Sequence, residues 1–171
     1  MSRSRDLSST AKLMSTELSS QVNTAASAPV WVAIWCLAIV FALVLGVGLA
    51  SNLVLRHFVQ TLPLWVGVMF GFRRSHLAPW VGLPLFLFWL ILMALIWSYL
   101  LGISHILSGH FSAIEIAMTI IVGAASMNGI ATFIRSKSLL SPIRRGGAFV
   151  VAALIQWICF RISFLPAIAH R

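Results

Sequence analysis

The spacing of the charged residues constrains this chain more than any other feature. Between Leu77 and Ile114 there is no Asp, Glu, Lys or Arg. A bilayer core is about 30 Å thick, and roughly 20 consecutive apolar residues in a helix are needed to cross it. Several stretches of this chain are that long. The sequence therefore predicts an all-α integral membrane protein, a bundle of four or five transmembrane helices with a short polar leader.

Composition excludes a separate soluble domain and points to lipid as the charged partner. The 171 residues are 60% hydrophobic, with a mean hydropathy of +1.01, and the net charge is +9. In a membrane protein such a positive excess normally lies in cytoplasmic loops, next to anionic headgroups. We therefore expect anionic lipid headgroups, and not nucleic acid, as the counter-charges. Cys36 and Cys159 both fall in apolar stretches and imply neither a disulfide framework nor a zinc site.

The apolar runs divide the chain into a leader and one membrane domain. Residues 1–28 are rich in Ser, Thr and Ala, and we expect a flexible cytoplasmic leader there. Residues 29–171 form the multi-pass membrane domain. The predicted spans are 29–50, 53–72, 79–103, 112–134 and 146–166.

The second of these segments is the ambiguous one. Residues 53–72 include Arg56, Gln60 and Pro63, which lower the hydropathy of the segment. One interpretation is a second span with Arg56 reaching toward the membrane surface. The other is an interfacial or re-entrant segment, which leaves four spans. The sequence favours five spans, because this arrangement places more of the Lys and Arg residues on the cytoplasmic side.

Loop charge predicts the orientation. Arg73 and Arg74 precede the third span. The loop between the fourth and fifth spans carries Arg135, Lys137, Arg144 and Arg145. The positive-inside rule places both loops in the cytoplasm, together with the N-terminus. We expect a plasma membrane or a bacterial inner membrane as the location.

Ser112 and Glu115 fit a capping box at the start of the fourth span, in which each side chain bonds a backbone N–H of the other residue. Glu115 is also the only acidic residue after Glu17, at a depth comparable to that of Arg161 in the last span. Three alternatives for Arg161 stay open. It extends to the membrane surface, it forms an intramembrane ion pair with Glu115, or it has a direct substrate or proton role.

His105 and His110 are the candidates for metal or haem ligands. Residues five apart point about 140° apart on a helix, and no known metal-binding spacing is present. We therefore favour ordinary interfacial histidines and predict no metal or cofactor.

Small and polar residues in the last two spans predict a helix-packing site, because small residues allow backbones to approach closely and amides bond across the contact. The site residues are Gly123, Ala125, Ser126, Asn128, Gly129 and Gln156. We expect Gln156 to meet Asn128 across this contact. The packing is between the protein's own helices or with a membrane-protein partner, which includes self-association.

No catalytic or nucleotide-binding motif stands out, so the sequence predicts a protein that is not an enzyme. The leading hypothesis is a structural or accessory subunit that packs against larger membrane partners. The first alternative is a homo-oligomeric small transporter or channel component, with a route lined by Glu115, Asn128, Gln156 and Arg161. The second alternative is a membrane enzyme with a metal or haem held by His105 and His110.

Overall fold

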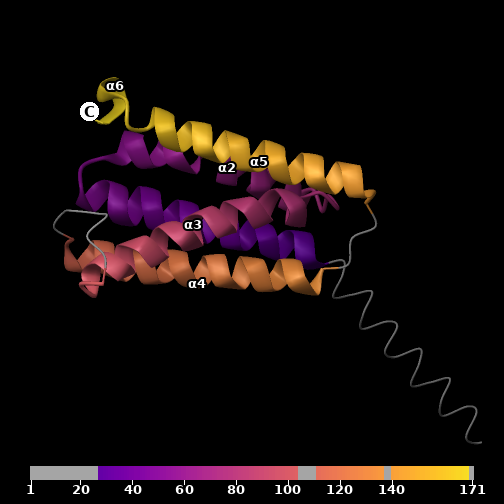
Figure 1. Ribbon diagram of the computed structural model, residues 1–171, viewed down its shortest axis with the longest axis horizontal. Helices are drawn as coiled ribbons and strands as arrows, with labels where there is room; N and C mark the ends of the chain where they lie inside the picture. Colours follow the sequence, from indigo (N-terminus) through magenta and orange to yellow (C-terminus); the bar gives the residue numbers. More distant parts are fainter. Residues whose placement is uncertain (1–26, 104–110, 137–139, 170–171) are drawn as a thin grey trace, which may run out of the picture.

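The computed structural model describes residues 27–103, 111–136 and 140–169 (Figure 1). Within these ranges the chain is all-α, without a β-strand. The predicted leader, residues 1–28, lies almost wholly outside them.

The described part of the chain contains five long helices that run alternately up and down one bundle (Figure 1). They are the first helix (Ser27–Gly48), α2 (Val54–Phe72), α3 (Ala78–Leu100), α4 (Ala113–Arg135) and α5 (Pro142–Ile162). A short helix, α6 (Pro166–Ala169), follows α5. Consecutive helices up to α4 pack on one another, whereas α5 packs on α3 and α2 instead of α4.

Four of the five long helices are long and apolar enough to cross a membrane, and α2 is the exception. Arg56, His57 and Gln60 make the first two turns of α2 polar. Its 19 residues nevertheless form one continuous helix, about 28 Å long at 1.5 Å per residue. It packs against the first helix, α3 and α5. Figure 1 shows α2 running alongside the other helices, as expected for a fifth membrane-crossing segment.

The last long helix begins earlier than residue 146, where the sequence analysis placed its start. The structure begins α5 at Pro142 and ends it at Ile162. Proline is favoured at the first position of a helix because the missing N–H has no helical partner there. Arg144 and Arg145 therefore belong to the first turn of α5 instead of the loop. The Arg145 side chain donates from Nε to the Leu140 carbonyl, at 2.6 Å.

The end of the first helix is a π-helix, η1 (Ala42–Gly48). In a π-helix each backbone carbonyl accepts a hydrogen bond from the N–H five residues later, instead of four residues later as in an α-helix. Such segments are rare and often occur at functional sites. Gly46 in η1 lies against the side chain of Met118 in α4, where a Cβ atom would collide with it. The wider turn of η1 thus lies directly beside α4, a helix that is distant in sequence.

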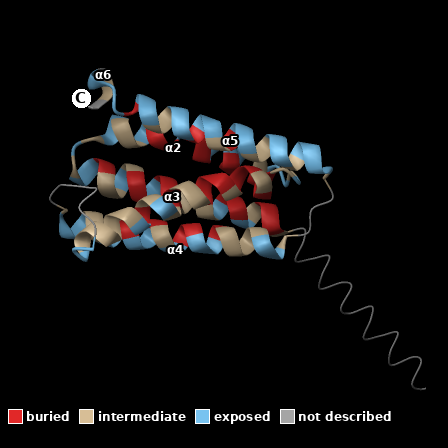
Figure 2. Cartoon of the chain, in the orientation of Figure 1, coloured by how far each residue is buried: buried red, intermediate tan, exposed pale blue. Residues whose placement is uncertain are grey.

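The core lies among the first helix, α2 and α3, which carry most of the buried residues (Figure 2). Phe86 and Trp89 of α3 are its largest side chains. Gly129 of α4 packs directly on the Phe86 ring, and a Cβ at Gly129 would lie 2.5 Å from ring carbons. By contrast, α5 is mostly exposed and buries only Ala152 and Gln156 within its bounds.

If α2 crosses the membrane, the two turns that flank it lie on opposite sides. Two variants test this, Asn52→Cys and Arg73→Cys, each made in a background of Cys36→Ala and Cys159→Ala. Each variant has a single described cysteine, at an exposed position in one of the two turns. We expect a membrane-impermeant maleimide to label one variant in intact cells and the other only after permeabilisation. Labelling of both from the same side would contradict a spanning α2.

The contact of Gly129 with Phe86 predicts a difference between two glycines of α4. Gly129→Ala forces the buried Phe86 ring to move and is expected to destabilise the fold by about 1 to 3 kcal/mol. At Gly123 a Cβ meets nothing within 4 Å, so Gly123→Ala is the matched control and leaves stability nearly unchanged. Thermal unfolding in one detergent compares the two. Equal midpoints would show that the close approach is absent.

Candidate functional site

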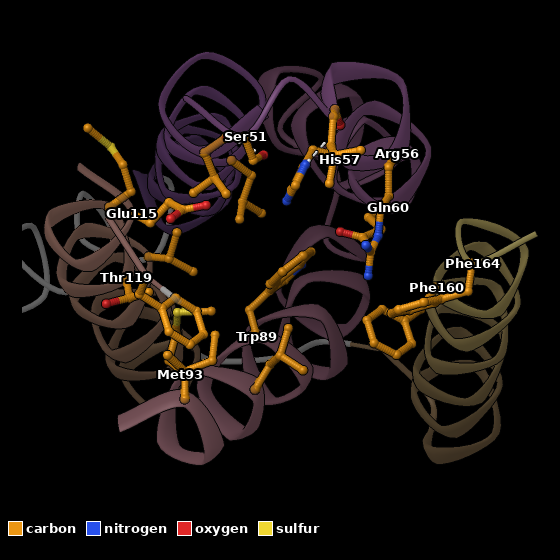
Figure 3. A pocket seen from close by; sticks show the side chains of 18 residues that line it. Ser51, Arg56, His57, Gln60, Trp89, Met93, Glu115, Thr119, Phe160 and Phe164 are labelled. Atoms are coloured by element: carbon orange, nitrogen blue, oxygen red, sulfur yellow. Dashed lines mark hydrogen bonds between the residues drawn. The ribbon is translucent and has the colours of Figure 1, made fainter. Parts of the chain in front are cut away.

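A cavity of about 420 Å³ lies at the end of the bundle where η1 ends and α4 begins. Five elements surround it, namely η1, α2, α3, α4 and α5 (Figure 3). It extends down α4 as far as Val122, which lies nine residues beyond Ala113 and so about 14 Å along the helix axis. Its polar lining comes from Ser51, Arg56, His57, Gln60, Glu115 and Thr119.

Three of these side chains share one side of α2. Arg56, His57 and Gln60 stand at positions i, i+1 and i+4, which a helix with 100° per residue places within about 100° of one another. All three line the cavity, and Leu53 at the N-terminus of α2 lines it as well. The polarity that makes α2 unlike the other helices is therefore directed into the bundle.

The His57 ring is oriented by its own helix. Its Nδ1 lies 3.0 Å from the Leu53 carbonyl oxygen. Because a carbonyl only accepts hydrogen bonds, Nδ1 is the donor, and Nε2 of the neutral ring remains an acceptor. Figure 3 shows the ring pointing into the cavity.

Arg56 is held by an aromatic ring and not by an acid. Its guanidinium carbon lies 4.1 Å from the centre of the Phe164 ring, just beyond α5. A cation over an aromatic face is stabilised by the ring quadrupole. The Nε atom of Arg56 is buried and has no hydrogen-bond partner in the described part of the chain. This N–H of the guanidinium is therefore a donor that no described residue uses.

Trp89 brings a second unused donor to the cavity. The side chain is 1% exposed, and its Nε1 is buried without an acceptor among the described residues. A buried indole N–H usually finds a partner. Figure 3 shows the Trp89 ring rising from α3 toward Gln60 and Arg56.

Buried hydrogen bonds join α2 to α5 beside the cavity. Gln60 donates from Nε2 to Ser163 Oγ at 2.9 Å, and Gln156 donates from Nε2 to the Gln60 carbonyl at 3.2 Å. Ser163 Oγ in turn donates to the Phe160 carbonyl at 2.7 Å. The three polar side chains are at most 5% exposed. If these bonds were absent, the buried polar groups that form them would be unpaired. Each such group would destabilise the fold by about 1 to 3 kcal/mol.

Glu115 on the opposite wall has the capping-box geometry expected from the sequence. Its Oε2 accepts hydrogen bonds from Ser112 N at 2.7 Å and from Ser112 Oγ at 2.9 Å, and Glu115 N donates to Ser112 Oγ at 3.3 Å. These bonds place the carboxylate at the start of α4, where it also lines the cavity. A helix N-terminus favours negative charge at this position.

The structure does not form the ion pair considered between Glu115 and Arg161. Arg161 is exposed on α5 and lines a surface hollow with Trp157 and Leu165, and Phe160 and Phe164 line both this hollow and the cavity. No ion pair joins Arg161 to Glu115 in the part of the chain that is described. Extension of the Arg161 side chain to the membrane surface stays a prediction.

The predicted packing site divides between two faces of α4. Ala125, Ser126 and Gly129 are buried, whereas Gly123 meets no neighbour at its Cβ position and Asn128 is exposed. Asn128 donates to its own helix, to the Ala124 carbonyl at 2.8 Å. Gln156 does not meet Asn128 as expected, because it bonds to Gln60 of α2. The helix that packs on the polar face of α5 is thus α2 and not α4.

His105 and His110 lie outside the described residues, so the structure gives no geometry for them. Among the residues that it does describe, no group of three His, Cys, Asp or Glu side chains is placed to hold a metal ion.

Sequence reasoning missed the cavity because it treated the polar residues of α2 as a defect in a span. The signal was their spacing, which collects Arg56, His57 and Gln60 on one helix face. Trp89 gave no signal, since a tryptophan in an apolar run is an ordinary core residue.

No protein-family model matches the chain, and comparisons with curated proteins and with solved structures gave no significant match. The functional argument therefore rests on the geometry of the site.

The hydrogen bond from Gln60 to Ser163 predicts different effects at two buried serines. Ser163→Ala removes the acceptor of a buried amide, and we expect a loss of about 1 to 3 kcal/mol of stability. Ser126→Ala is the control, because Ser126 is equally buried but bonds only the Val122 carbonyl of its own helix. Such a bond adds little to helix stability. Both variants are compared by thermal unfolding in one detergent. An equal loss of stability in Ser126→Ala and Ser163→Ala would contradict the interhelical hydrogen bond.

Proposed function

We propose that this chain is a small membrane protein of the transporter or channel class that binds a polar solute in the cavity. The observation that carries this proposal is the set of three ionisable side chains in one cavity: Arg56 and His57 from α2 and Glu115 from α4. Ionisable groups within membrane helices are costly, and they commonly mark substrate or ion pathways.

The bonding of these groups favours a ligand over a purely structural role. Among the described residues, no carboxylate pairs with Arg56, and Arg56 Nε and Trp89 Nε1 both lack an acceptor. A structural network stabilises a fold only when its members are satisfied. Groups that stay unsatisfied in the protein alone are ready to bond a bound molecule.

The size of the cavity suits a small molecule. About 420 Å³ falls within the range of roughly 300 to 1,000 Å³ that is usual for ligand pockets. Its walls are mainly apolar, from residues such as Leu92, Ile96 and Val122, with a few polar groups among them. By the positive-inside rule, the cavity lies at the non-cytoplasmic end of the bundle, opposite the turn with Arg73 and Arg74 and the start of α5 with Arg144 and Arg145.

The proposal is tested by the small molecules that accompany the protein. The full chain is purified in a mild detergent and analysed by native mass spectrometry, with denatured samples searched for released solutes. We expect a bound small molecule in the wild type. Its occupancy should fall about tenfold or more in Arg56→Gln and in Glu115→Gln, since each variant loses a charge-assisted contact.

Arg161→Gln is the matched control, because Arg161 is an exposed arginine of α5 whose side chain does not line the cavity. It is expected to retain the wild-type occupancy. A wild-type protein without any bound solute, or an equal loss in all three variants, would contradict the proposal.

The accessory-subunit hypothesis remains as a second proposal, and exposed residues of two helices support it. Besides apolar surface, α4 presents Asn128, and α5 presents Gly146 and Gly147, where an added Cβ meets nothing within 4 Å. Small residues on an open face permit close helix contact with a partner. Stoichiometric protein companions in the same purification would support this second proposal, and a particle containing only this chain would contradict it.

A further inference from the structure

The cavity holds opposite charges on opposite walls. Arg56 lies on the α2 side, over the Phe164 ring, and Glu115 lies on the α4 side, as Figure 3 shows. No ion pair joins the two within the described part of the chain. Opposite charges in a cavity of low dielectric constant attract strongly, so a pair held apart by the helices leaves each charge available to a ligand.

We infer that the cavity binds a zwitterion, with its anionic group at Arg56 and its ammonium group at Glu115. This inference rests on the proposed function and names the class of its solute. Arg56 and Glu115 already balance one another, and the hydrogen bond from His57 Nδ1 to the Leu53 carbonyl is compatible with a neutral ring. A solute with one net charge would leave the occupied cavity charged, whereas a zwitterion pairs both residues and adds no net charge.

The hydrogen-bonding groups divide in the same way as the charges. Among the described residues that line the cavity, the buried unpartnered groups on the Arg56 side are donors, Arg56 Nε and Trp89 Nε1, which suit a carboxylate or a phosphate. A third buried atom without a partner, the acceptor Gln156 Oε1, belongs to a side chain that does not line the cavity. Glu115 directs both of its capping bonds to Oε2, which leaves Oε1 without a donor from Ser112.

Two hydroxyl groups add acceptors for the ammonium group. Thr119, one turn beyond Glu115 on the same helix, donates its own proton to the Ile116 carbonyl at 2.7 Å. Ser51 donates its proton to the Val47 carbonyl at 2.7 Å. Each hydroxyl oxygen that has donated still has lone pairs to accept a bond, and both residues line the cavity.

The rest of the lining selects a solute with an apolar body. Leu92, Met93 and Ile96 of α3, together with Met118 and Val122 of α4, supply apolar lining besides the charged groups. Burying apolar groups of the solute against them favours binding. An anionic group next to an ammonium group with an apolar body occurs in two sources, a free apolar amino acid and an amine-bearing phospholipid.

Binding of matched probes to the full chain in a non-ionic detergent tests this inference. The probes are L-leucine, 4-methylpentanoate, which lacks the ammonium, and 3-methylbutylamine, which lacks the carboxylate. For the lipid source, dihexanoyl phosphatidylethanolamine is compared with dihexanoyl phosphatidylglycerol. We expect at least one zwitterion, leucine or the ethanolamine lipid, to bind about tenfold or more tightly than its singly charged counterparts. Which zwitterion binds identifies the source.

Variants show whether the two charges act as assigned. Glu115→Gln keeps the capping box, because Gln serves at that position as well as Glu. It should weaken binding of the zwitterion about tenfold while it strengthens binding of the matching anion, since a repulsive carboxylate is gone. Arg56→Gln should weaken binding of the zwitterion and strengthen binding of the amine, and Arg161→Gln should leave the binding of both unchanged.

Tighter binding of an anion or an amine than of both zwitterions would overturn the inference, and so would an absence of binding by every probe. The proposed function would survive either result if the purified protein still carried a solute of another class that depends on Arg56 and Glu115. If the purified protein carries no solute and no probe binds, both fail.

Discussion

The rest of this structure depends on the burial of the polar face of α2 against α5. Lipid offers no hydrogen bonds, so a helix with Arg56, His57 and Gln60 in its first turns is stable within a bundle only if other helices cover and bond those groups. The Gln60 amide bonds Ser163, the Gln156 amide bonds the Gln60 backbone, and the Arg56 guanidinium lies over Phe164. Together with the packing of α3 on α5, which includes Phe88 against Phe160, these contacts hold the mostly exposed α5 on the bundle.

The same arrangement produces the cavity. The bonds between α2 and α5 hold the Gln60 amide, whereas Arg56 Nε and Trp89 Nε1, which belong to residues lining the cavity, have no acceptor among the described residues. The π-helical end of the first helix and the capping box of α4 complete the wall, with Glu115 held at the helix start. Features that each serve the fold locally therefore enclose a space with separated charges, and we propose that this space binds a solute.

The helical membrane class and the approximate spans were predictable, because a run without charges leaves the chain few other folds. Apolar length does not say which helices touch. From the sequence, Gln156 is expected to contact Asn128, and an ion pair between Glu115 and Arg161 is one alternative. In the structure Gln156 bonds Gln60, and Arg161 is exposed. Residues on different helices meet through rotation and order in the bundle, which hydropathy does not encode. The capping box is different, since all of its atoms lie within four consecutive residues.

The most direct test of this account is a double-mutant cycle between Gln60 and Ser163. Gln60→Leu, Ser163→Ala and the double variant are compared with the wild type by reversible unfolding in one detergent. The account predicts a coupling energy of about 0.6 to 2 kcal/mol, the range for hydrogen bonds between membrane helices. Additive effects within about 0.3 kcal/mol would mean that the two side chains do not interact. In that case the packing of α2 on α5, and the cavity beside it, would not be as described.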